Sequence, residues 1–489
     1  MEETGVCFVT NVSAQTQLAV AATSPILCNM KPISPIRWDA LAGYARDPKT
    51  TFMAEEVGWY EHASERVVGL LIRDYEDNEY AGVIFGRDKK YRFRCVSIND
   101  FDSRRRHAEV ALRRELERVA AEPDTDYHQG DERGKPVDFF KAVVPEVRLN
   151  PSFVRLRDEE VYSAARGIIE PMMRWYNDVD GNFIEQFQTT GFDARIWELY
   201  LFAAFREMNY GIERVHAVPD FECTNPLTTF AVEATTVNPS QDASGAPLPE
   251  PPLNTPEEIQ AYLTGYMPIK CGSALTSKLA KKYWEKSHLA GMPLMFAVQD
   301  FSAPPSMIYT RSAFEQYIVG YAHDWDRDEN GRLRIHPRKI GTHRWGTKEI
   351  PSGFFELPGT ENISAVAFSN SGTISKFNRM GVLAGFGSSR LRLVREGTAV
   401  DHDPNATEPL KFRRSVNDAN YYETWVEGLD FWHNQKALHP IDPRVLPGAA
   451  HHLPDSDGQV QHMVPDWHPL GSITLHWLDR SDQQTKVKP

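Results

Sequence analysis

The sequence predicts an α/β fold of the α+β type, and three observations predict it. The chain has 489 residues, which is more than one hydrophobic core usually supports, so two or three domains are expected. Between Arg66 and Ile98, three β-rich runs alternate with polar turns, which predicts an antiparallel meander. Between Phe192 and Asp300, the periodicity changes in the order helix, three strands, helix, strand, which predicts an αβββαβ unit.

The helix predicted after the meander, from near Ser103 to Ala121, is the most basic element of the chain. Its arginines could contact phosphates. However, Glu109, Glu115 and Glu117 lie on the same helix, which favours a solvated helix with internal ion pairs. A strongly polar linker follows and marks the first domain boundary.

We expect three regions along the chain. They are an N-terminal β-meander with the basic helix, a helical bridge leading into the αβββαβ core, and a mixed α/β C-terminal extension with a Pro- and His-rich tail, at 1–135, 136–310 and 311–489. The tail histidines, from His433 to His476, have spacings that match no zinc-ligand template. We therefore expect them at the surface, in irregular structure.

Composition and missing motifs limit the classes of protein that fit. A hydrophobic content of 41% with 25% charged residues is typical of a soluble globular protein. No apolar run is long enough to predict a membrane span. Five scattered cysteines without a Cys-x-x-Cys pair favour a reducing, cytoplasmic location. The net charge of −13 counts against a protein that binds nucleic acid indiscriminately along its length. The sequence contains neither G-x-x-x-x-G-K-[ST] nor G-x-S-x-G, which argues against an ATP-driven motor and a serine hydrolase.

Two carboxylates stand in the segment 219–237, at positions where core strands usually carry aliphatic residues. Two short β-type runs are joined there by a loop, so antiparallel pairing can bring Asp220 and Glu233 within reach of one ion. Along the second run, Phe230 and Val232 face one way and Glu233 faces the other. Two ionised carboxylates in a partly buried strand pair repel unless a cation, a proton or a basic partner neutralises them. An all-oxygen site of this kind suits Mg²⁺ or Mn²⁺.

The order of elements and the spacing of three acidic motifs resemble the PD-(D/E)XK nuclease superfamily, which has a restriction-endonuclease-like fold. The motifs are Glu198 in the first helix, Pro219-Asp220, and Glu-Ala-Thr at 233–235. The resemblance covers the stretch 192–300. It implies a catalytic centre that holds Mg²⁺ or Mn²⁺ through Asp220, Glu233, the Ala234 carbonyl and, directly or through water, Glu198.

One position departs from the family pattern. The pattern ends in a lysine two residues after the second acidic residue, where the amine orients or activates the attacking water, and this chain has Thr235 there. Lys278, on the next predicted helix, is the candidate for a displaced catalytic lysine, with Lys281 or Lys282 as the alternative. Lys282 is also a candidate contact to nucleic acid.

The function implied by the resemblance is that of a metal-dependent endonuclease, with DNA favoured over RNA and a role in defence against foreign DNA. One alternative is a module of the same fold that binds nucleic acid or signals without cutting, because Thr235 replaces the lysine. A second alternative is a structural or interaction protein, which the acidic charge and the large flanking regions suggest. A homodimer that cuts both strands is compatible with the sequence, as is a monomer.

The segment 361–381 provides another candidate contact to nucleic acid. A predicted strand ends in a Ser-Asn-Ser-Gly-Thr turn, which opens a short helix bearing Lys376 and Arg379. Backbone N–H groups at such a helix start can bind an anion, which suits a phosphate. The alternative is an ordinary helix cap made by Ser371 or Thr373.

Overall fold

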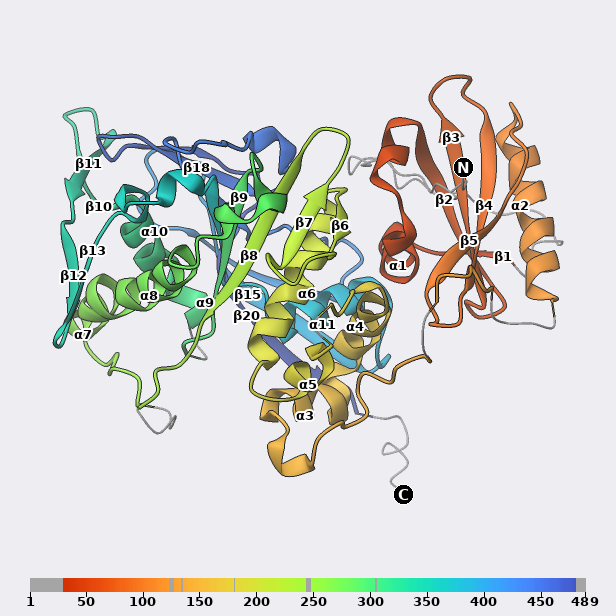
Figure 1. The fold of residues 1–489 in the computed structure, drawn as a ribbon, viewed down its shortest axis with the longest axis horizontal. Helices are drawn as coiled ribbons and strands as arrows, with labels where there is room; N and C mark the ends of the chain where they lie inside the picture. Colours follow the sequence, from red (N-terminus) through yellow and green to blue (C-terminus); the bar gives the residue numbers. More distant parts are fainter. Residues whose placement is uncertain are drawn as a thin grey trace, which may run out of the picture. The chain divides into compact units, whose positions relative to one another are not determined.

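The computed structural model describes residues 30–122, 127–132, 135–179, 181–242, 248–303 and 306–480. The chain divides into two compact units (Figure 1). Unit 1 contains 1–142, 162–177 and 380–387, and unit 2 contains 143–161, 178–379 and 388–489. None of the helices in the described part of the chain is long and apolar enough to cross a membrane.

Unit 1 is built on a five-stranded antiparallel sheet with strands in sequence order. Leu112 and Leu116 of one helix pack on one face of the sheet, and Trp38 of another helix packs on the other. The predicted meander and its following helix are therefore confirmed. The elements are β1 (Met30–Pro32), β2 (Ala54–His62), β3 (Val67–Asp74), β4 (Tyr80–Arg87), β5 (Phe93–Ile98), α1 (Pro35–Leu41), α2 (Arg105–Ala120) and α4 (Ser163–Trp175).

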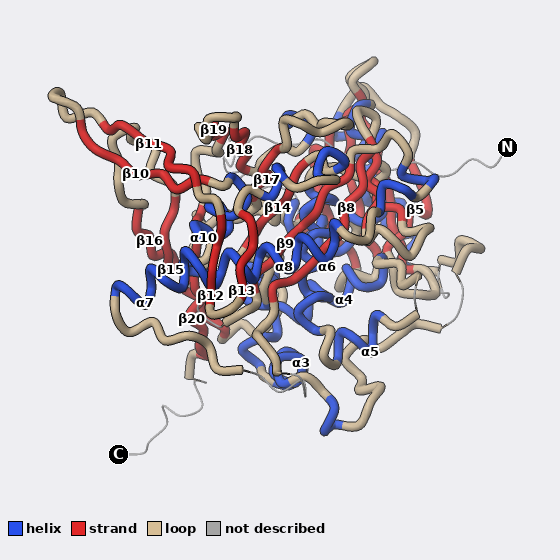
Figure 2. Tube along the Cα trace, turned by 60° about the vertical axis from the view of Figure 1, so that its left-hand side comes forward, coloured by secondary structure: helices blue, strands red, loops and turns tan. Residues whose placement is uncertain are grey.

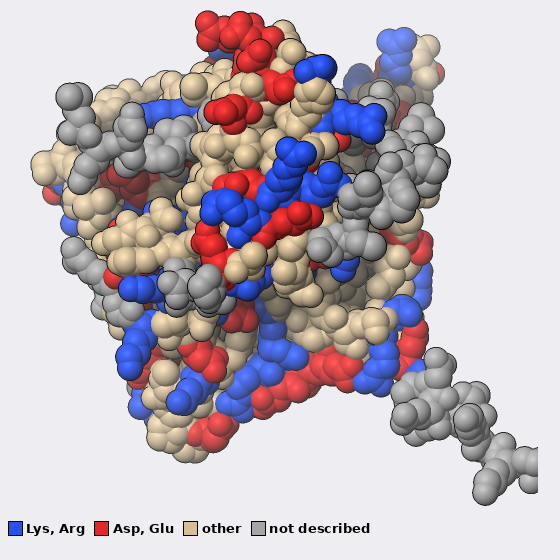
Figure 3. Space-filling model, turned by 90° about the vertical axis from the view of Figure 1, so that its right-hand side faces the viewer, with Lys and Arg blue, Asp and Glu red and all other residues tan. Residues whose placement is uncertain are grey.

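Two arginines of α2 pair with acidic side chains of the same region. Arg105 lies 2.9 Å from Glu109, and Arg118 lies 2.7 Å from both Glu115 and Glu122. On the face of the molecule drawn in Figure 3, Lys and Arg side chains are interspersed with Asp and Glu side chains. The helix is thus solvated and laced with internal ion pairs, as its sequence favours.

Unit 2 is built on an eight-stranded mixed sheet (Figures 1 and 2). Its strand order is β19-β18-β17-β14-β9-β8-β7-β6. The pairs β6–β7, β7–β8, β14–β17 and β18–β19 are antiparallel, whereas β8–β9, β9–β14 and β17–β18 are parallel. The strands are β6 (Gly211–Glu213), β7 (Phe221–Thr224), β8 (Thr229–Val237), β9 (Leu294–Asp300), β14 (Ala365–Ser369), β17 (Asp430–His433), β18 (Ala450–Pro454) and β19 (Val460–Met463).

Helices α6 (Phe192–Glu207) and α8 (Met267–Leu279) cover opposite faces of the β7–β8–β9 region. Phe205 of α6 contacts Phe230 of β8, whereas Leu275 of α8 joins the buried cluster that contains Ala231. Since successive strand residues point to opposite sides, these contacts assign the even-numbered residues of this part of β8 to the α6 face and the odd-numbered residues to the α8 face. The observed order α6, β6, β7, β8, α8, β9 matches the predicted helix–three strands–helix–strand order, apart from the additional short helix α7 (Pro256–Ala261) between β8 and α8.

The remaining elements of unit 2 surround this sheet. Strands β15 and β20 pair in a second sheet with β16, and the β10–β11 hairpin projects from the unit (Figure 2). The elements are β10 (Tyr321–Arg327), β11 (Leu333–Lys339), β12 (Thr342–Trp345), β13 (Lys348–Pro351), β15 (Leu391–Ala399), β16 (Leu410–Ser415), β20 (Pro469–Leu478), α3 (Pro151–Asp158), α5 (Phe183–Gln188), α7 (Pro256–Ala261), α9 (Ser306–Tyr309), α10 (Arg311–Val319) and α11 (Ile374–Leu383).

The division into units differs from the three regions expected from the sequence. Residues after 310 do not form a separate domain, because β14 pairs in parallel with β9 and so continues the sheet that 136–310 begins. Strands β17, β18 and β19 extend the same sheet further. A boundary at 310 would cut through one hydrophobic core.

Candidate functional site

The two acidic positions face each other across the β7–β8 strand pair. Phe221 of β7 pairs with Val232 of β8, so the preceding residue, Asp220, lies opposite Glu233. Asp220 Oδ2 accepts a hydrogen bond from the Ala234 amide at 2.8 Å. The N–H and C=O of one strand residue point toward the same neighbouring strand, so the Ala234 carbonyl lies on the side of Asp220.

Glu233 receives two donors from the segment that covers its face of the sheet. Lys278 Nζ, in the last turn of α8, lies 2.5 Å from Glu233 Oε1. The Tyr283 hydroxyl, in the turn after α8, donates to the same oxygen at 2.7 Å. Glu233 is buried, and its charge is compensated by an amine and fixed in orientation by a phenol. The structure thus brings Lys278 to Glu233, and it adds Tyr283, which the sequence reasoning missed.

Asp220 is the electrostatically costly member of the pair. Burial raises its pKa to about 8, and the neighbouring carboxylates Glu198 and Glu233 raise it too, against a lowering effect of Lys278. A carboxyl group with this pKa binds a proton at neutral pH unless a cation replaces that proton. Asp220 is therefore the group in this region that has most to gain from a bound metal ion.

Glu198 lies in the second turn of α6 and is buried. Both of its oxygens accept from Arg195 at 2.8 Å, and Arg195 is also held by Gln186. The ion pair of Glu198 with Arg195, three residues earlier on the same helix, was not predicted. The negative charge of Glu198 raises the pKa of Asp220, but both oxygens of Glu198 are already bonded to Arg195.

The oxygens of Glu198, Asp220 and Glu233 do not all lie as close to one another as the ligands of one metal ion. Over the residues that the structure describes, one group of three metal-binding side chains has ligand atoms that all lie within 4.8 Å of one another, and it consists of His216, Glu222 and His288. Glu198, Asp220 and Glu233 are not such a group. Asp220, Glu233 and the Ala234 carbonyl offer oxygen donors that suit Mg²⁺ in chemistry, whereas the expected direct role of Glu198 is not supported by its position.

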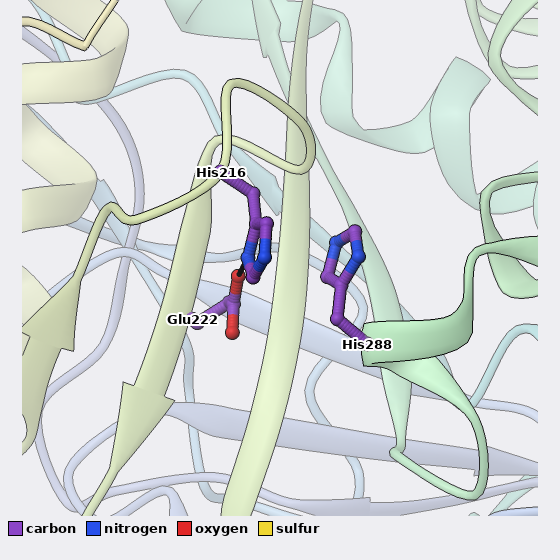
Figure 4. Close-up of side chains that lie close together, drawn as sticks. All are labelled: His216, Glu222 and His288. Carbon is purple, nitrogen blue, oxygen red and sulfur yellow. Dashed lines mark hydrogen bonds and ion pairs between the residues drawn. The ribbon is translucent and has the colours of Figure 1, made fainter.

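The His216, Glu222 and His288 side chains converge from three segments (Figure 4). His216 Nδ1 lies 2.7 Å from Glu222 Oε1, and the His216 and His288 rings stack with centroids 3.8 Å apart. Glu222 stands two residues after Asp220 on the same face of the β7 segment. No local pattern predicts this group, because His288 is far from His216 and Glu222 along the chain.

The proposed phosphate contact at the start of α11 is not supported by the structure. Lys376 and Arg379 are buried. Lys376 Nζ lies 2.7 Å from Glu423 Oε1, and Arg379 makes two hydrogen bonds to Glu423 at 2.8 and 2.9 Å. Both cations compensate a buried glutamate instead of facing a ligand. Lys282, in contrast, is exposed beside Glu285, so its predicted contact stays a prediction.

The expectation of surface histidines in the C-terminal tail is wrong for the members that lie on β17, β18 and near β20. Asp430 Oδ1 accepts from His452 Nε2 at 3.1 Å and from His468 Nε2 at 3.0 Å, while Asp430 Oδ2 contacts Arg311. The buried histidines are His433, His451, His452 and His468. His433, His451 and His452 are buried because β17 and β18 lie inside the extended sheet, and each of the four rings bonds to a polar partner through at least one nitrogen.

Comparison of the chain with protein-family models, with curated proteins and with solved structures finds no match.

Proposed function

We propose that this protein is a metal-dependent nuclease that hydrolyses phosphodiester bonds, in DNA rather than RNA. The observation that carries the proposal is the convergence of an acidic strand pair with a lysine from another element. Asp220 and Glu233 lie across from each other, and Lys278 Nζ lies 2.5 Å from Glu233 Oε1. Carboxylates that hold a hard cation beside a lysine are the groups that phosphodiester hydrolysis needs.

The residues of the site would have separate roles in hydrolysis. Asp220, Glu233 and the Ala234 carbonyl would hold Mg²⁺ or Mn²⁺. When bound, such an ion polarises a phosphoryl oxygen and lowers the pKa of a water molecule. Lys278 orients a water or a phosphate oxygen and offsets the negative charge that develops in the reaction. Tyr283 holds Glu233 in one orientation through its 2.7 Å hydrogen bond.

The order of elements supports a restriction-endonuclease-like core for this part of unit 2. Helix α6 precedes the antiparallel strands β6, β7 and β8, and helix α8 precedes β9, which pairs in parallel with β8. The lysine two residues after Glu233 is replaced by Thr235. Lys278 of α8 would take over the role of that lysine, because it reaches Glu233 across the face of the sheet.

A catalytically inactive module of the same fold is the second candidate function. The specific observation that favours it is the closed contact of Lys278 with Glu233, whose side chains are only 19% and 7% exposed. A lysine held this way must shift to contact a substrate. Binding of Mg²⁺ separates the two candidates, because an inactive module has no need of the ion.

Cleavage of plasmid DNA and of single-stranded RNA in the presence of Mg²⁺ tests the proposal. The variants Asp220→Asn and Glu233→Gln should lose activity by at least about a thousandfold, with unchanged circular dichroism. Glu213→Gln, which alters an exposed carboxylate on the neighbouring strand β6, is the matched control and should retain activity. Equal activity in both site variants and in the control would remove the nuclease assignment.

Defence against foreign DNA in the cytoplasm is the role that such a nuclease would serve. A homodimer would allow both strands of a duplex to be cut at one place. Nicked and linear products distinguish the two arrangements, because a monomer with one site nicks first, whereas a dimer yields linear plasmid directly.

A further inference from the structure

Three side chains beside the acidic strand pair form a second cluster with a different chemistry. His216 lies in the segment before β7, Glu222 lies in β7, and His288 lies in the turn after α8 (Figure 4). One ligand atom from each side chain lies within 4.8 Å of the others. Two imidazoles and one carboxylate therefore converge on one small volume of the α8 face of the sheet.

The hydrogen bonds fix which imidazole nitrogens can bind a metal. His288 Nε2 lies 3.0 Å from the Val218 carbonyl, and a carbonyl oxygen only accepts, so Nε2 carries the hydrogen and Nδ1 of the neutral ring has a lone pair. His216 Nδ1 faces the Glu222 carboxylate at 2.7 Å, so an ion held by both side chains would take the place of the proton in this contact, with Nδ1 and a Glu222 oxygen as its ligands. A ring whose second nitrogen donates to a carbonyl, as that of His288 does, has the usual support of a metal-binding histidine.

The rings can turn toward a shared ion. In the structure they lie face to face, at 14° to each other, so their in-plane lone pairs run nearly parallel and do not meet at one point. Rotation of one ring about its Cβ–Cγ bond corrects this, and that torsion is broad in histidine. The His216 side chain is 43% exposed, so the space for the rotation is present.

We propose that His216, Glu222 and His288 form a binding site for a zinc-class transition metal, separate from the oxygen-rich site of Asp220 and Glu233. Imidazole and carboxylate ligands suit Zn²⁺ and Co²⁺, whereas Mg²⁺ prefers oxygen ligands alone. Three protein ligands leave a coordination position for a water molecule or a substrate atom. This inference does not rest on the nuclease proposal.

Such an ion would tie together two segments that contact each other through the His288–Val218 hydrogen bond and the stacked histidine rings. The His216 loop leads into Pro219 and Asp220, and the His288 turn follows Tyr283 and ends at β9. The metal would therefore fix both segments that flank the acidic pair. Glu222 is two residues from Asp220 on one strand, so the two sites are separated by roughly 7 Å along β7.

Titration of the full-length, metal-free protein with Co²⁺ alone tests the site. We expect visible d–d absorption of a four- or five-coordinate ion that saturates at one equivalent and is displaced by Zn²⁺ but not by millimolar Mg²⁺. His216→Ala and His288→Ala should each weaken Co²⁺ binding by at least about tenfold to a hundredfold. His336→Ala, at an exposed histidine of β11, is the control and should leave the titration unchanged.

Two further measurements keep the test independent of folding and of cleavage. Circular dichroism of the metal-free variants should match the wild type, and Glu222→Gln provides a variant of nearly equal shape that should also weaken binding. Asp220→Asn should retain the Co²⁺ spectrum even though it loses cleavage. Absence of the absorption band in the wild type, or Co²⁺ titrations of both histidine variants that match the wild type, would overturn this site. Either result would leave the nuclease proposal untouched.

Discussion

Among the described residues of unit 2, a lysine meets a buried glutamate at two places, and these places differ in what surrounds the pair. At the acidic strand pair, Lys278 contacts Glu233 at 2.5 Å, next to the half-buried Asp220. At the start of α11, Lys376 contacts Glu423 at 2.7 Å, and two arginines also surround that glutamate, Arg379 at 2.8 Å and Arg395 at 3.3 Å.

The difference appears in the pKa values of the carboxylates. The cations around Glu423 outweigh the effect of burial and hold its pKa well below the usual range. Asp220 has the opposite shift, to about 8, because burial and two neighbouring carboxylates outweigh one lysine. A buried carboxylate whose charge is compensated by cations of the chain stabilises the fold, whereas the Asp220 cluster, in which negative charges are left unbalanced, needs a further cation. This contrast supports a structural role for the Glu423 cluster and underlies the proposed metal binding at Asp220.

The largest expected effect is on stability at the Glu423 cluster. Glu423→Ala leaves Lys376, Arg379 and Arg395 buried without their shared carboxylate, so we expect a loss of about 3–5 kcal/mol in the free energy of unfolding. Urea denaturation followed by tryptophan fluorescence measures this loss. Glu356→Ala, which breaks the exposed pair with Lys436, is the control and should change stability by less than about 1 kcal/mol. Similar losses in the two variants would contradict the structural role of Glu423.

Removal of the amine at the unbalanced cluster should affect catalysis instead. Lys278→Met keeps most of the side chain's volume and removes the charge beside Glu233, so we expect cleavage to fall by about 10²–10⁴-fold. Binding of Mg²⁺ should persist, because the carboxylates remain and lose a competing cation. Initial rates at saturating Mg²⁺, together with calorimetry, separate the two effects. Loss of Mg²⁺ binding with the amine would place Lys278 in a different role.

In EDTA, Asp220 and Glu423 should change the stability of the fold in opposite directions as the pH rises. The pKa of Asp220 is about 8 when folded and about 4 when unfolded. The folded state therefore binds more protons between these values, and its stability falls as the pH rises through this window. Asp220→Asn should remove this fall.

Glu423 should behave in the opposite way at low pH. Its folded pKa is lowered, so its stabilisation is present above the unfolded value near 4.5 and is lost as the pH falls below it.

Thermal unfolding of the wild type and Asp220→Asn between pH 4 and 9 measures the contribution of Asp220 to the pH dependence of stability. Parallel curves over that range would mean that Asp220 is already neutralised by groups of the chain.

The smallest expected effect concerns the orientation of Glu233. Tyr283→Phe removes one charge-assisted hydrogen bond of 2.7 Å and leaves the ring packed against Phe296. We expect cleavage to fall about tenfold, which corresponds to about 1.4 kcal/mol, within the range for one hydrogen bond to a charged group. Steady-state kinetics measures this change. An unchanged rate would show that Lys278 alone holds Glu233 in place.

Local patterns predicted the parts of the site that depend on neighbours in sequence. Alternation along 230–237 assigned Glu233 and Phe230 to opposite faces, and the predicted order of elements placed Lys278 on the helix beside the strand pair; the structure has both features. Tyr283 was not predicted, because its hydroxyl meets Glu233 only after α8 folds onto the sheet.

Long-range partners explain the incorrect interpretations. Lys376 and Arg379 resembled an anion site because Glu423, which buries them, lies 47 and 44 residues further along the chain. The tail histidines resembled surface residues because nothing local reveals that their strands extend a sheet begun near Gly211. Sequence periodicity specifies which way a side chain points, but not which distant element covers it.

Calorimetric titration of the metal-free protein with Mg²⁺ tests most directly whether the unbalanced carboxylates bind a divalent cation. We expect one Mg²⁺ per chain in the wild type, no detectable binding in Asp220→Asn and Glu233→Gln, and unchanged binding in Glu423→Gln, provided that this variant folds by circular dichroism. No binding of Mg²⁺ to the wild type, or equal binding in the wild type and Asp220→Asn, would contradict the account.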